Sequence, residues 1–492
     1  MKLFCTLLIV FLCQVRLNAQ IITIGDTGDY PTLNAVEDFV SPGDTLMLQS
    51  QTFTGFQSWF DISGTPSAPI VIMAEVEHQT FFTGGATAIY LHNCSNIEIN
   101  GLVIEGQTVN GINIDDGGNY STPALNITIR NCIFRDFSAR NMLKMSGIDN
   151  FLIEDCEFMN TSLDFYSDAG IDFVGCHHGT VQDNYFDSSG GVGIVCKGGS
   201  QFITIRRNFI KNNTKRAINI GGGTGFQFFR PPLPDPIVDA FEAADIEVYS
   251  NVFVGSFSQV SFETSVRSKV YNNTFYNPSV WVIRILGKPN TSFLECADNE
   301  FINNIVYLEN DLTEVNIGPN TQPQTFTFSN NLWYNASDAN WTPILPVTDT
   351  NQIIAAPIFE DLQNENFRVN HISPAIGNGL AVSEPILDFD ENPFNTSRSI
   401  GAFENRSTLS TSDFSQERIV VYPNPVSETI HIENNTSNLI DKVSLYTIDG
   451  KQIKVNYSDG VVDVSQISAG MYFFKIYVKN SSQSHIKKIV KQ

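Results

Sequence analysis

Short apolar runs separated by Gly and Asn corners dominate the middle of the chain. In Gly190–Gly223, GGVGIVCKGGSQFITIRRNFIKNNTKRAINIGGG, three such runs follow one another: Val192–Cys196, Phe202–Ile205 and Ala217–Ile220. Strands this short are poorly suited to a sandwich, in which longer strands pair side by side. The pattern favours a chain that coils and stacks each turn on the last.

A repeat accompanies this pattern from Tyr90 to about Trp333. A β-branched or aliphatic residue is followed three positions later by Asn or Cys, at corners spaced 22 to 28 residues apart except for one gap of 43 residues. The corner residues are Cys132, Cys156, Asn184, Asn208, Asn251 and Asn273, with Asn331 a weaker match. This period predicts an all-β fold, a parallel β-helix over residues 20–405. Asn tolerates a left-handed corner, and stacked Asn amides can bond along the axis. A leucine-rich horseshoe is the alternative, but Leu is scarce at these positions.

The two ends of the predicted coil carry different signals. After a first strand, Leu33–Phe39 has the pattern of a short amphipathic helix, which would cover the open end of the first coil. This opening and the segment Ser63–Glu75 resemble the N-terminal cap and first coils of pectate-lyase-like, right-handed parallel β-helices. Toward the other end the repeat fades between about Ser373 and Glu404, which predicts a last irregular coil.

The last part of the chain follows another pattern. Residues 406–418 are polar and predict a linker, and residues 419–492 alternate as short strands with Pro-Asn-Pro, Asp-Gly and Ala-Gly turns, which predicts a small β-sandwich. Tyr422–Pro425, Asp449–Lys451, Gly470–Tyr472 and the basic end closely resemble the C-terminal sorting domain of the type IX secretion system of Bacteroidetes. That resemblance implies passage through the outer membrane by this machinery and cleavage of the domain. A carbohydrate-binding sandwich is the alternative.

The first 19 residues predict a secretory signal peptide. A Lys near the start precedes a largely apolar run, Leu3–Cys13. Leu17–Ala19 ends in a small residue of the kind found at signal-peptide cleavage sites, so we expect cleavage near Ala19. Length excludes a membrane anchor, because about 11 residues cannot cross a bilayer that needs roughly 20. No later segment is long enough either. We therefore expect a soluble protein that is secreted or held at the cell surface.

The charge and the cysteine content limit the classes of ligand and metal that the protein can bind. The chain has 29 basic and 52 acidic residues, a net charge of −23, which repels nucleic acid and anionic lipid. Six of the eight cysteines lie beyond the signal, and none forms a Cys-x-x-Cys pair, which disfavours a zinc site. Export permits disulfides, yet we expect buried free thiols at Cys132, Cys156 and Cys196.

Alternation along the strands places a row of polar side chains on one outer face of the predicted coil. The row contains Lys144, Asp172, Lys197, Asn219, Glu263 and Arg284. His177 and His178 fall in the turn after Asp172. The gap of 43 residues holds one insertion, Gly221–Asp245, whose aromatic run and Arg230 predict a lid beside Lys197. A solvated sheet face, solvated loop histidines and a disordered excursion are the alternatives.

Such a face suits a chain-like ligand, and basic groups within an acidic protein suit an acidic polysaccharide. Cleavage by β-elimination needs a base beside the sugar carboxylate and cations that stabilise the enolate-like charge. A Lys crowded by other cations gives up its proton more readily, so Lys197 is the candidate base and Arg216 its catalytic partner. The candidate substrate-binding residues are Lys144, Asp172, His177, His178, Asn219, Arg230, Glu263 and Arg284.

The segment IVCKGGSQFITIRRNFI, together with Arg216, resembles alginate-lyase and chondroitinase-type β-helix lyases, in which a Lys on one coil and an Arg on the next do the chemistry. In that pattern the Arg closes the next strand, whereas Arg216 precedes it here. No Asn/Glu/Glu calcium set lies one coil upstream, so calcium binding is left open. A glycoside hydrolase is a second reading, although Asp172 and Glu263 are roughly 14 Å apart and too distant for it. A non-catalytic adhesin or carbohydrate-binding protein is a third.

Overall fold

The computed structural model describes residues 19–118, 120, 124–138, 140–161, 168–290, 292–382, 386–405, 419–434, 440–447, 451–458, 460–478 and 484–492. The chain divides into two compact units, Met1–Arg406 and Ser407–Gln492. The expected signal peptide, apart from Ala19, and the expected linker 406–418 lie outside the described residues, so both stay predictions. Within the described part of the chain, no helix is long and apolar enough to cross a membrane.

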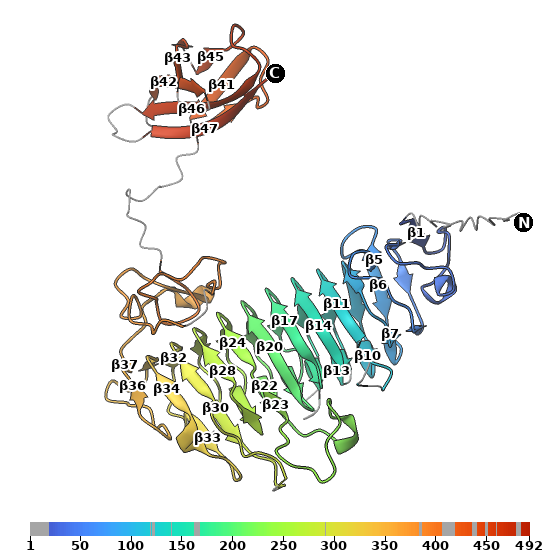
Figure 1. Ribbon diagram of the computed structural model, residues 1–492. Helices are drawn as coiled ribbons and strands as arrows, with labels where there is room; N and C mark the ends of the chain where they lie inside the picture. The colour runs from blue at the N-terminus through green and yellow to red at the C-terminus, as the bar shows by residue number, and fades with distance from the viewer. Residues whose placement is uncertain are drawn as a thin grey trace, which may run out of the picture. The chain divides into compact units, whose positions relative to one another are not determined.

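Successive coils of the first unit contribute strands to three parallel sheets, and each sheet runs along the coil axis (Figure 1). Sheet A contains β1 (Ile21–Ile24), β2 (Thr45–Leu48), β5 (Ile70–Ala74), β8 (Ile97–Asn100), β11 (Ala124–Arg130), β14 (Ile148–Glu154), β17 (His177–Gln182), β20 (Ser200–Arg206), β23 (Ala243–Ala244), β24 (Glu247–Tyr249), β27 (Ser265–Val266), β28 (Lys269–Tyr271), β31 (Glu300–Ile302), β34 (Thr327–Ser329) and β36 (Asp349–Thr350).

Sheet B contains β3 (Thr52–Phe53), β6 (Thr80–Thr83), β9 (Leu102–Glu105), β12 (Ile133–Arg135), β15 (Glu157–Met159), β18 (Tyr185–Asp187), β21 (Phe209–Lys211), β25 (Val252–Val254), β29 (Thr274–Tyr276), β32 (Ile305–Leu308), β35 (Leu332–Asn335) and β37 (Ile353–Ile354). Sheet C contains β4 (Gln57–Phe60), β7 (Thr87–His92), β10 (Asn110–Asp115), β13 (Asn141–Ser146), β16 (Ala169–Val174), β19 (Val192–Lys197), β22 (Arg216–Gly221), β26 (Ser258–Glu263), β30 (Trp281–Leu286) and β33 (Val315–Ile317).

Apolar side chains fill the interior of the coil and stack from one coil to the next. Phe134, Phe158 and Phe186 lie in register on sheet B, with ring centroids 4.8 and 4.6 Å apart, and all three are fully buried. Because parallel strands in register place like positions above one another, an apolar position repeated in every coil builds one continuous core. The predicted parallel β-helix is confirmed.

Buried asparagines form a ladder at the corner between sheets A and B. Each side-chain amide of the ladder donates to Oδ1 of the next member at 2.9–3.1 Å. The members are Asn184, Asn208, Asn251, Asn273, Asn304 and Asn331, and Asn304 is an addition to the predicted set. The stacking is confirmed, but the expected left-handed backbone belongs to the preceding residue, such as Arg207 or Ser250. The ladder asparagines therefore serve through their side chains.

All six cysteines from Cys94 to Cys296 are buried free thiols, as expected for Cys132, Cys156 and Cys196. Burial raises the pKa of the Cys94 thiol to about 11 and that of the Cys296 thiol to about 12. Because only the thiolate is a good nucleophile, these side chains are inert members of the core.

Both ends of the coil differ from their predictions. Only one turn of 3-10 helix, η1 (Asn34–Val36), replaces the expected helix, although Leu33 and Val36 are buried over the first coil as a cap requires. The segment after β37 is not a last coil. It carries β38 (Phe359–Asp361), η4 (Leu362–Asn364) and β39 (Asn366–Val369), and packs its apolar side chains against the outer surface of β25 and β29. Two further 3-10 turns are η2 (Phe226–Phe228) and η3 (Pro323–Thr325).

The second unit consists of two four-stranded antiparallel sheets. One contains β40 (Ile419–Tyr422), β41 (Thr429–Asn434), β44 (Tyr457–Ser458) and β45 (Val461–Asp463), and the other contains β42 (Ile440–Thr447), β43 (Gln452–Ile453), β46 (Gly470–Val478) and β47 (Ser484–Lys491). Ile430 and Val462 from the first sheet share one core with Leu445 and Phe474 from the second. This arrangement confirms the predicted small β-sandwich.

Candidate functional site

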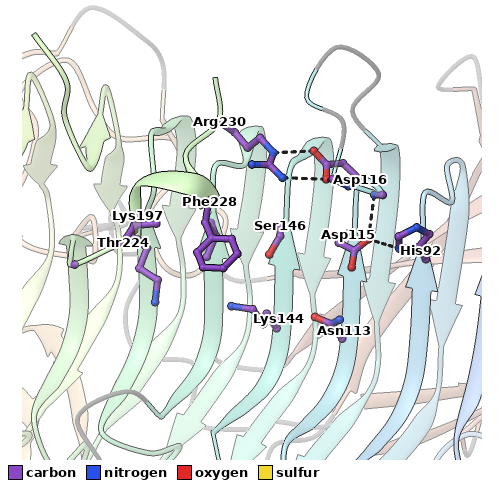
Figure 2. A pocket seen from close by; sticks show the side chains of 15 residues that line it. His92, Asn113, Asp115, Asp116, Lys144, Ser146, Lys197, Thr224, Phe228 and Arg230 are labelled. Atoms are coloured by element: carbon purple, nitrogen blue, oxygen red, sulfur yellow. Dashed lines mark hydrogen bonds and ion pairs between the residues drawn. The ribbon is translucent and has the colours of Figure 1, made fainter. Parts of the chain in front are cut away.

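A pocket of about 510 Å³ lies on the outer face of sheet C, where the insertion after β22 folds back over the sheet (Figure 2). Its floor is formed by side chains of β7, β10, β13, β16 and β19, and its wall by residues 223–230. The floor residues are His92, Asn113, Asp115, Lys144, Ser146, Val174 and Lys197; Gly223, Thr224, Gly225, Phe228 and Arg230 form the wall, and Asp116, Gly117 and Gly118 the rim.

One buried carboxylate near the end of the insertion holds this wall in place. The two oxygens of Glu242, a fully buried residue, accept hydrogen bonds from the backbone N–H groups of Gly198 and Thr224, from the Thr224 hydroxyl and from the Lys288 ammonium, at 2.6–2.9 Å. Gly198 directly follows Lys197, so the insertion is attached to the turn that carries this lysine. The predicted position of the insertion beside Lys197 is confirmed.

Two rows of outward side chains cross sheet C beneath the pocket. Strand register aligns Asn113, Lys144, Asp172, Val195, Asn219, Ser261 and Arg284 in one row, and His92, Asp115, Ser146, Val174 and Lys197 in the other. The polar residues expected on one face do share it. Lys197, however, lies in the second row. Glu263 pairs with Gly221, two residues after Asn219, so it also lies outside the first row.

Lys144, Asp172 and Lys197 form an ion cluster on the floor of the pocket. The Asp172 carboxylate lies 2.8 Å from the Lys144 ammonium through Oδ2 and 2.8 Å from the Lys197 ammonium through Oδ1. Its side chain is 4% exposed, whereas those of the lysines are 29% and 22% exposed. Burial alone would raise the pKa of Asp172, but the two ammonium groups outweigh it and hold the pKa below its ordinary value. The cluster carries a net charge of one positive unit.

The backbones of Lys197 and Arg216 are offset along their strands. Arg216 is in register with Val192, five residues before Lys197 on the neighbouring strand, which is about 16 Å along the strand at roughly 3.3 Å per residue. The expected separation of one coil spacing left out this offset, so the two backbones lie further apart than predicted, and the two charged groups bind different carboxylates. Arg216 instead donates to Glu263 at 3.1 Å, and Glu263 also accepts from Asn219 at 3.1 Å.

The expected surroundings of Lys197 were wrong as well. The charged group in contact with its ammonium is the Asp172 carboxylate, not another cation. This ion pair fixes the Lys197 ammonium on the floor of the pocket, and the ammonium contacts a carboxylate rather than the cations on which its predicted role as a base depended.

Two predicted arginines lie on the face of sheet C at different distances from the cluster. Arg230 belongs to the pocket wall, where its guanidinium binds the buried Asp116 carboxylate at 2.9 Å (Figure 2). Arg284 lies further along the sheet; its guanidinium stacks over the Trp281 ring at 4.5 Å and donates to Asn316 at 3.1 Å. Arg284 can thus contact only a ligand that extends beyond the pocket.

The two predicted histidines lie outside the pocket. His177 and His178 are the first residues of β17 in sheet A, and not a turn as expected. His177 is buried, and its ring nitrogens lie 3.0 Å from the Asp149 carboxylate and 3.1 Å from the Gly199 carbonyl oxygen. The ring of His178 stacks on Phe202, with centroids 4.9 Å apart. Both contacts are structural, and neither histidine adds to the surface of the pocket.

Sequence reasoning missed a polar cluster at the other end of the pocket. Asp115 accepts a hydrogen bond from the Tyr90 hydroxyl at 2.7 Å, and its other oxygen lies 2.8 Å from Nδ1 of His92. Burial, and then the contact with Asp115, raise the pKa of Tyr90. The alternation that marked the later strands also holds in β7. It was overlooked because His92 is not followed by a Gly-rich turn, the signal used for the other strands.

Two carboxylates at the pocket are already paired with cations. Asp116 is neutralised by Arg230 and Asp172 by two lysines, so neither has charge left for a hard cation, which needs several oxygen ligands. Within the described part of the chain, no three His, Cys, Asp or Glu side chains converge in a way that could hold a metal ion.

Known protein families agree with both folds. Residues 73–230 match the family model described as right handed beta helix region, and residues 420–492 match the model described as secretion system C-terminal sorting domain. The first unit is a right-handed parallel β-helix, and the second is a sorting domain of the type IX secretion system rather than a carbohydrate-binding sandwich. The chain is therefore exported by that machinery, to the cell surface or the medium.

Several solved structures share the β-helix at low identity. They include pectate lyase Pel9A (13% identity, covering 78% of this chain and 96% of that chain, TM-score 0.46), a rhamnogalacturonan lyase (13%, 72% and 96%, TM-score 0.43) and an alginate lyase from Paenibacillus sp. str. FPU-7 (15%, 61% and 97%, TM-score 0.38). None of the curated proteins compared with the chain matches it. Similarities this distant assign no activity, and any function must rest on the site itself.

Proposed function

We propose that the pocket on sheet C binds an acidic polysaccharide and cleaves it by β-elimination. The observation that carries this proposal is the ion cluster of Lys144, Asp172 and Lys197. In a protein with a net charge of −23, it places two partly exposed ammonium groups on the floor of a pocket. Asp172 fixes both of them before any ligand arrives, and charges fixed in advance bind an anionic group without the cost of ordering them.

The rest of the pocket supports a sugar as the carrier of that anionic group. Phe228 is 55% exposed, and its ring points into the pocket (Figure 2). A flat aromatic surface beside polar side chains is what the apolar face and the hydroxyl groups of a sugar require. The outward rows of sheet C continue on both sides of the pocket, to Phe60 and to Arg284. A polymer can therefore extend along the sheet in both directions.

The cationic floor also supports the reaction type. Removing the proton beside a sugar carboxylate moves negative charge onto the carboxylate oxygens, and two ammonium groups there stabilise that charge as it develops. Lys197 remains a catalytic residue in this proposal, in the role of charge stabilisation, with Lys144 beside it. Arg216, Asn219 and Glu263 lie further along the face, where they would contact neighbouring sugars.

The test is the product formed by the secreted protein from a panel of acidic and neutral polysaccharides. Elimination leaves a conjugated uronate that absorbs in the ultraviolet, and we expect this signal from an acidic polymer. Lys197→Ala should lower the rate at least about 10²-fold, the usual effect of losing one stabilising group. Arg267→Ala, which removes an ion-paired cation from the corner between β27 and β28, is the matched control and should leave the rate unchanged.

Three outcomes would refute the proposal. New reducing ends without ultraviolet absorbance would identify a hydrolase. Binding of a polysaccharide without any cleavage would identify an adhesin or carbohydrate-binding protein. Full activity of Lys197→Ala, with the variant shown by circular dichroism to be folded, would remove the ion cluster from the reaction.

A further inference from the structure

His92, Asp115 and the Tyr90 hydroxyl form a polar cluster on the floor of the pocket. Nδ1 of His92 lies 2.8 Å from Oδ1 of Asp115. Nδ1 also lies 2.9 Å from the Tyr90 hydroxyl, which itself donates to the other oxygen of Asp115. Both groups beside Nδ1 can then only accept, so Nδ1 carries the ring proton and Nε2 carries the lone pair. Asp115 is itself fixed, because it accepts from the Tyr90 hydroxyl at 2.7 Å and from the Gly117 N–H group at 3.0 Å.

The lone pair on Nε2 is accessible from the pocket. The His92 side chain is 32% exposed and lines the pocket, and its ring packs against those of Phe60 and Tyr90, with centroids 5.2 and 5.8 Å away. Among the residues that the structure describes, no hydrogen bond to Nε2 is present. The turn above it contains Gly117 at φ +72, where a Cβ would lie 3.4 Å from Nε2 and 3.1 Å from Asn93. Glycine at this position leaves the space beside Nε2 open.

We propose that His92 is the general base of this site, with Asp115 as its positioning residue. This inference rests on the proposed function. Nε2 takes the proton from the carbon beside the sugar carboxylate, and the electron pair of that C–H bond forms the carbon–carbon double bond. The bond to the glycosidic oxygen breaks, the departing oxygen takes up a proton from water, and His92 returns its proton to solvent. The products are a chain with a new hydroxyl end and an unsaturated uronate.

The position of His92 relative to the lysines fits this step. Register places Asp115 beside His92 on the next strand, and Lys144 one strand further and two residues offset. Two coil spacings, about 10 Å, therefore separate the strands of His92 and Lys144. This gap accommodates a sugar ring whose carboxylate reaches the lysines while the adjacent C–H bond faces Nε2. Base and charge-stabilising cations then act on opposite sides of the same sugar.

The other ionisable groups of the pocket are less suited to remove a proton. The ammonium groups of Lys144 and Lys197 are both ion-paired with Asp172. Asp116 is neutralised by Arg230. His92 combines an accessible lone pair with a partner that stabilises the positive charge it acquires, which is the arrangement that general-base catalysis requires.

The experiment compares His92→Ala and Asp115→Asn with the wild-type enzyme on whichever acidic polysaccharide the wild type cleaves. We expect His92→Ala to lower kcat about 10²- to 10⁴-fold with little change in the dissociation constant for the polymer. Added imidazole should restore part of that rate, because it can occupy the space left by the side chain. Asp115→Asn should lower kcat with KM unchanged, since an amide no longer selects the same ring tautomer. Lys197→Ala should instead weaken binding as well as turnover.

The outcomes separate this inference from the function on which it rests. If the wild-type enzyme forms no ultraviolet-absorbing product from any acidic polysaccharide, the proposed function is refuted and the role of His92 with it. If the wild type and Lys197→Ala behave as proposed but folded His92→Ala keeps its rate, the assignment of the base alone is wrong. Loss of rate without rescue by imidazole would also overturn it, because the side chain would then be structural. His92→Gln serves as a second variant if the alanine variant does not fold.

Discussion

The Glu242 carboxylate holds the wall of the pocket in place, and replacing Glu242 by Gln tests how far the wall depends on it. Oε2 binds the Gly198 N–H group and the Thr224 hydroxyl, while Oε1 binds the Thr224 N–H group and the Lys288 ammonium. Gln keeps the shape but replaces one acceptor by an NH2 donor. In its better orientation the amide oxygen replaces Oε1, the Thr224 hydroxyl turns to accept, and only the Gly198 N–H group loses its partner.

The magnitude follows from these contacts. An unsatisfied buried N–H group costs about 1–3 kcal/mol. Lys288 also loses its anionic partner, and breaking a buried ion pair costs about 3–5 kcal/mol in total. Exposure does not reduce this figure much, because the Glu242 side chain is 0% and the Lys288 side chain 17% exposed. We expect the loop to open about 10²- to 10³-fold more often, which corresponds to roughly 3–4 kcal/mol.

Hydrogen exchange measured by mass spectrometry would detect this opening. Exchange of the peptide that covers Thr224 to Phe229 should accelerate by that factor in Glu242→Gln, and polysaccharide affinity should fall with it. Glu247→Gln, a change on sheet A where the carboxylate accepts from the Tyr271 hydroxyl at 3.3 Å, is the matched control. Exchange within threefold of the wild-type rate would show that Glu242 does not hold the wall.

Three further changes probe the ion cluster, the aromatic wall and the ladder. Asp172→Asn should lower the free energy of unfolding at pH 7 by about 3 kcal/mol. Because the pKa of Asp172 is lowered in the fold, the stability difference between wild type and variant should persist down to about pH 4 and disappear at lower pH. Thermal unfolding measured across this pH range checks it. Phe228→Ala should raise KM about tenfold with kcat nearly unchanged, the loss of roughly 1.4 kcal/mol of stacking; an unchanged KM in steady-state kinetics would exclude contact with the sugar. Asn251→Leu leaves the Ile205 and Tyr249 carbonyl oxygens without their donor. It should lower the free energy of unfolding by on the order of 4 kcal/mol, and the denaturation midpoint with it. An unaltered midpoint would contradict the importance of the ladder.

The corner repeat and the alternation within strands were sufficient to predict the coil and its outward face. Both are local properties: a side chain points in or out according to its neighbours within two residues, and a corner is fixed by the few residues that form it. For this reason Lys144, Asp172 and Lys197 were placed on the correct face. The same locality explains why the Gly-rich insertion was placed beside Lys197, since the chain leaves β22 there.

Only the tertiary structure decided which of these side chains meet. The offset between Lys197 and Arg216 depends on the lengths of the turns between coils, and a difference of five residues moves a backbone position by about 16 Å. Asp116 and Arg230 form an ion pair although they are 114 residues apart, because the insertion folds back across several coils. His92 and Asp115 likewise become partners through strand register. The sequence thus determined the coil and the side chains on its surface, whereas long-range register and packing determined the charges and the candidate base of the site.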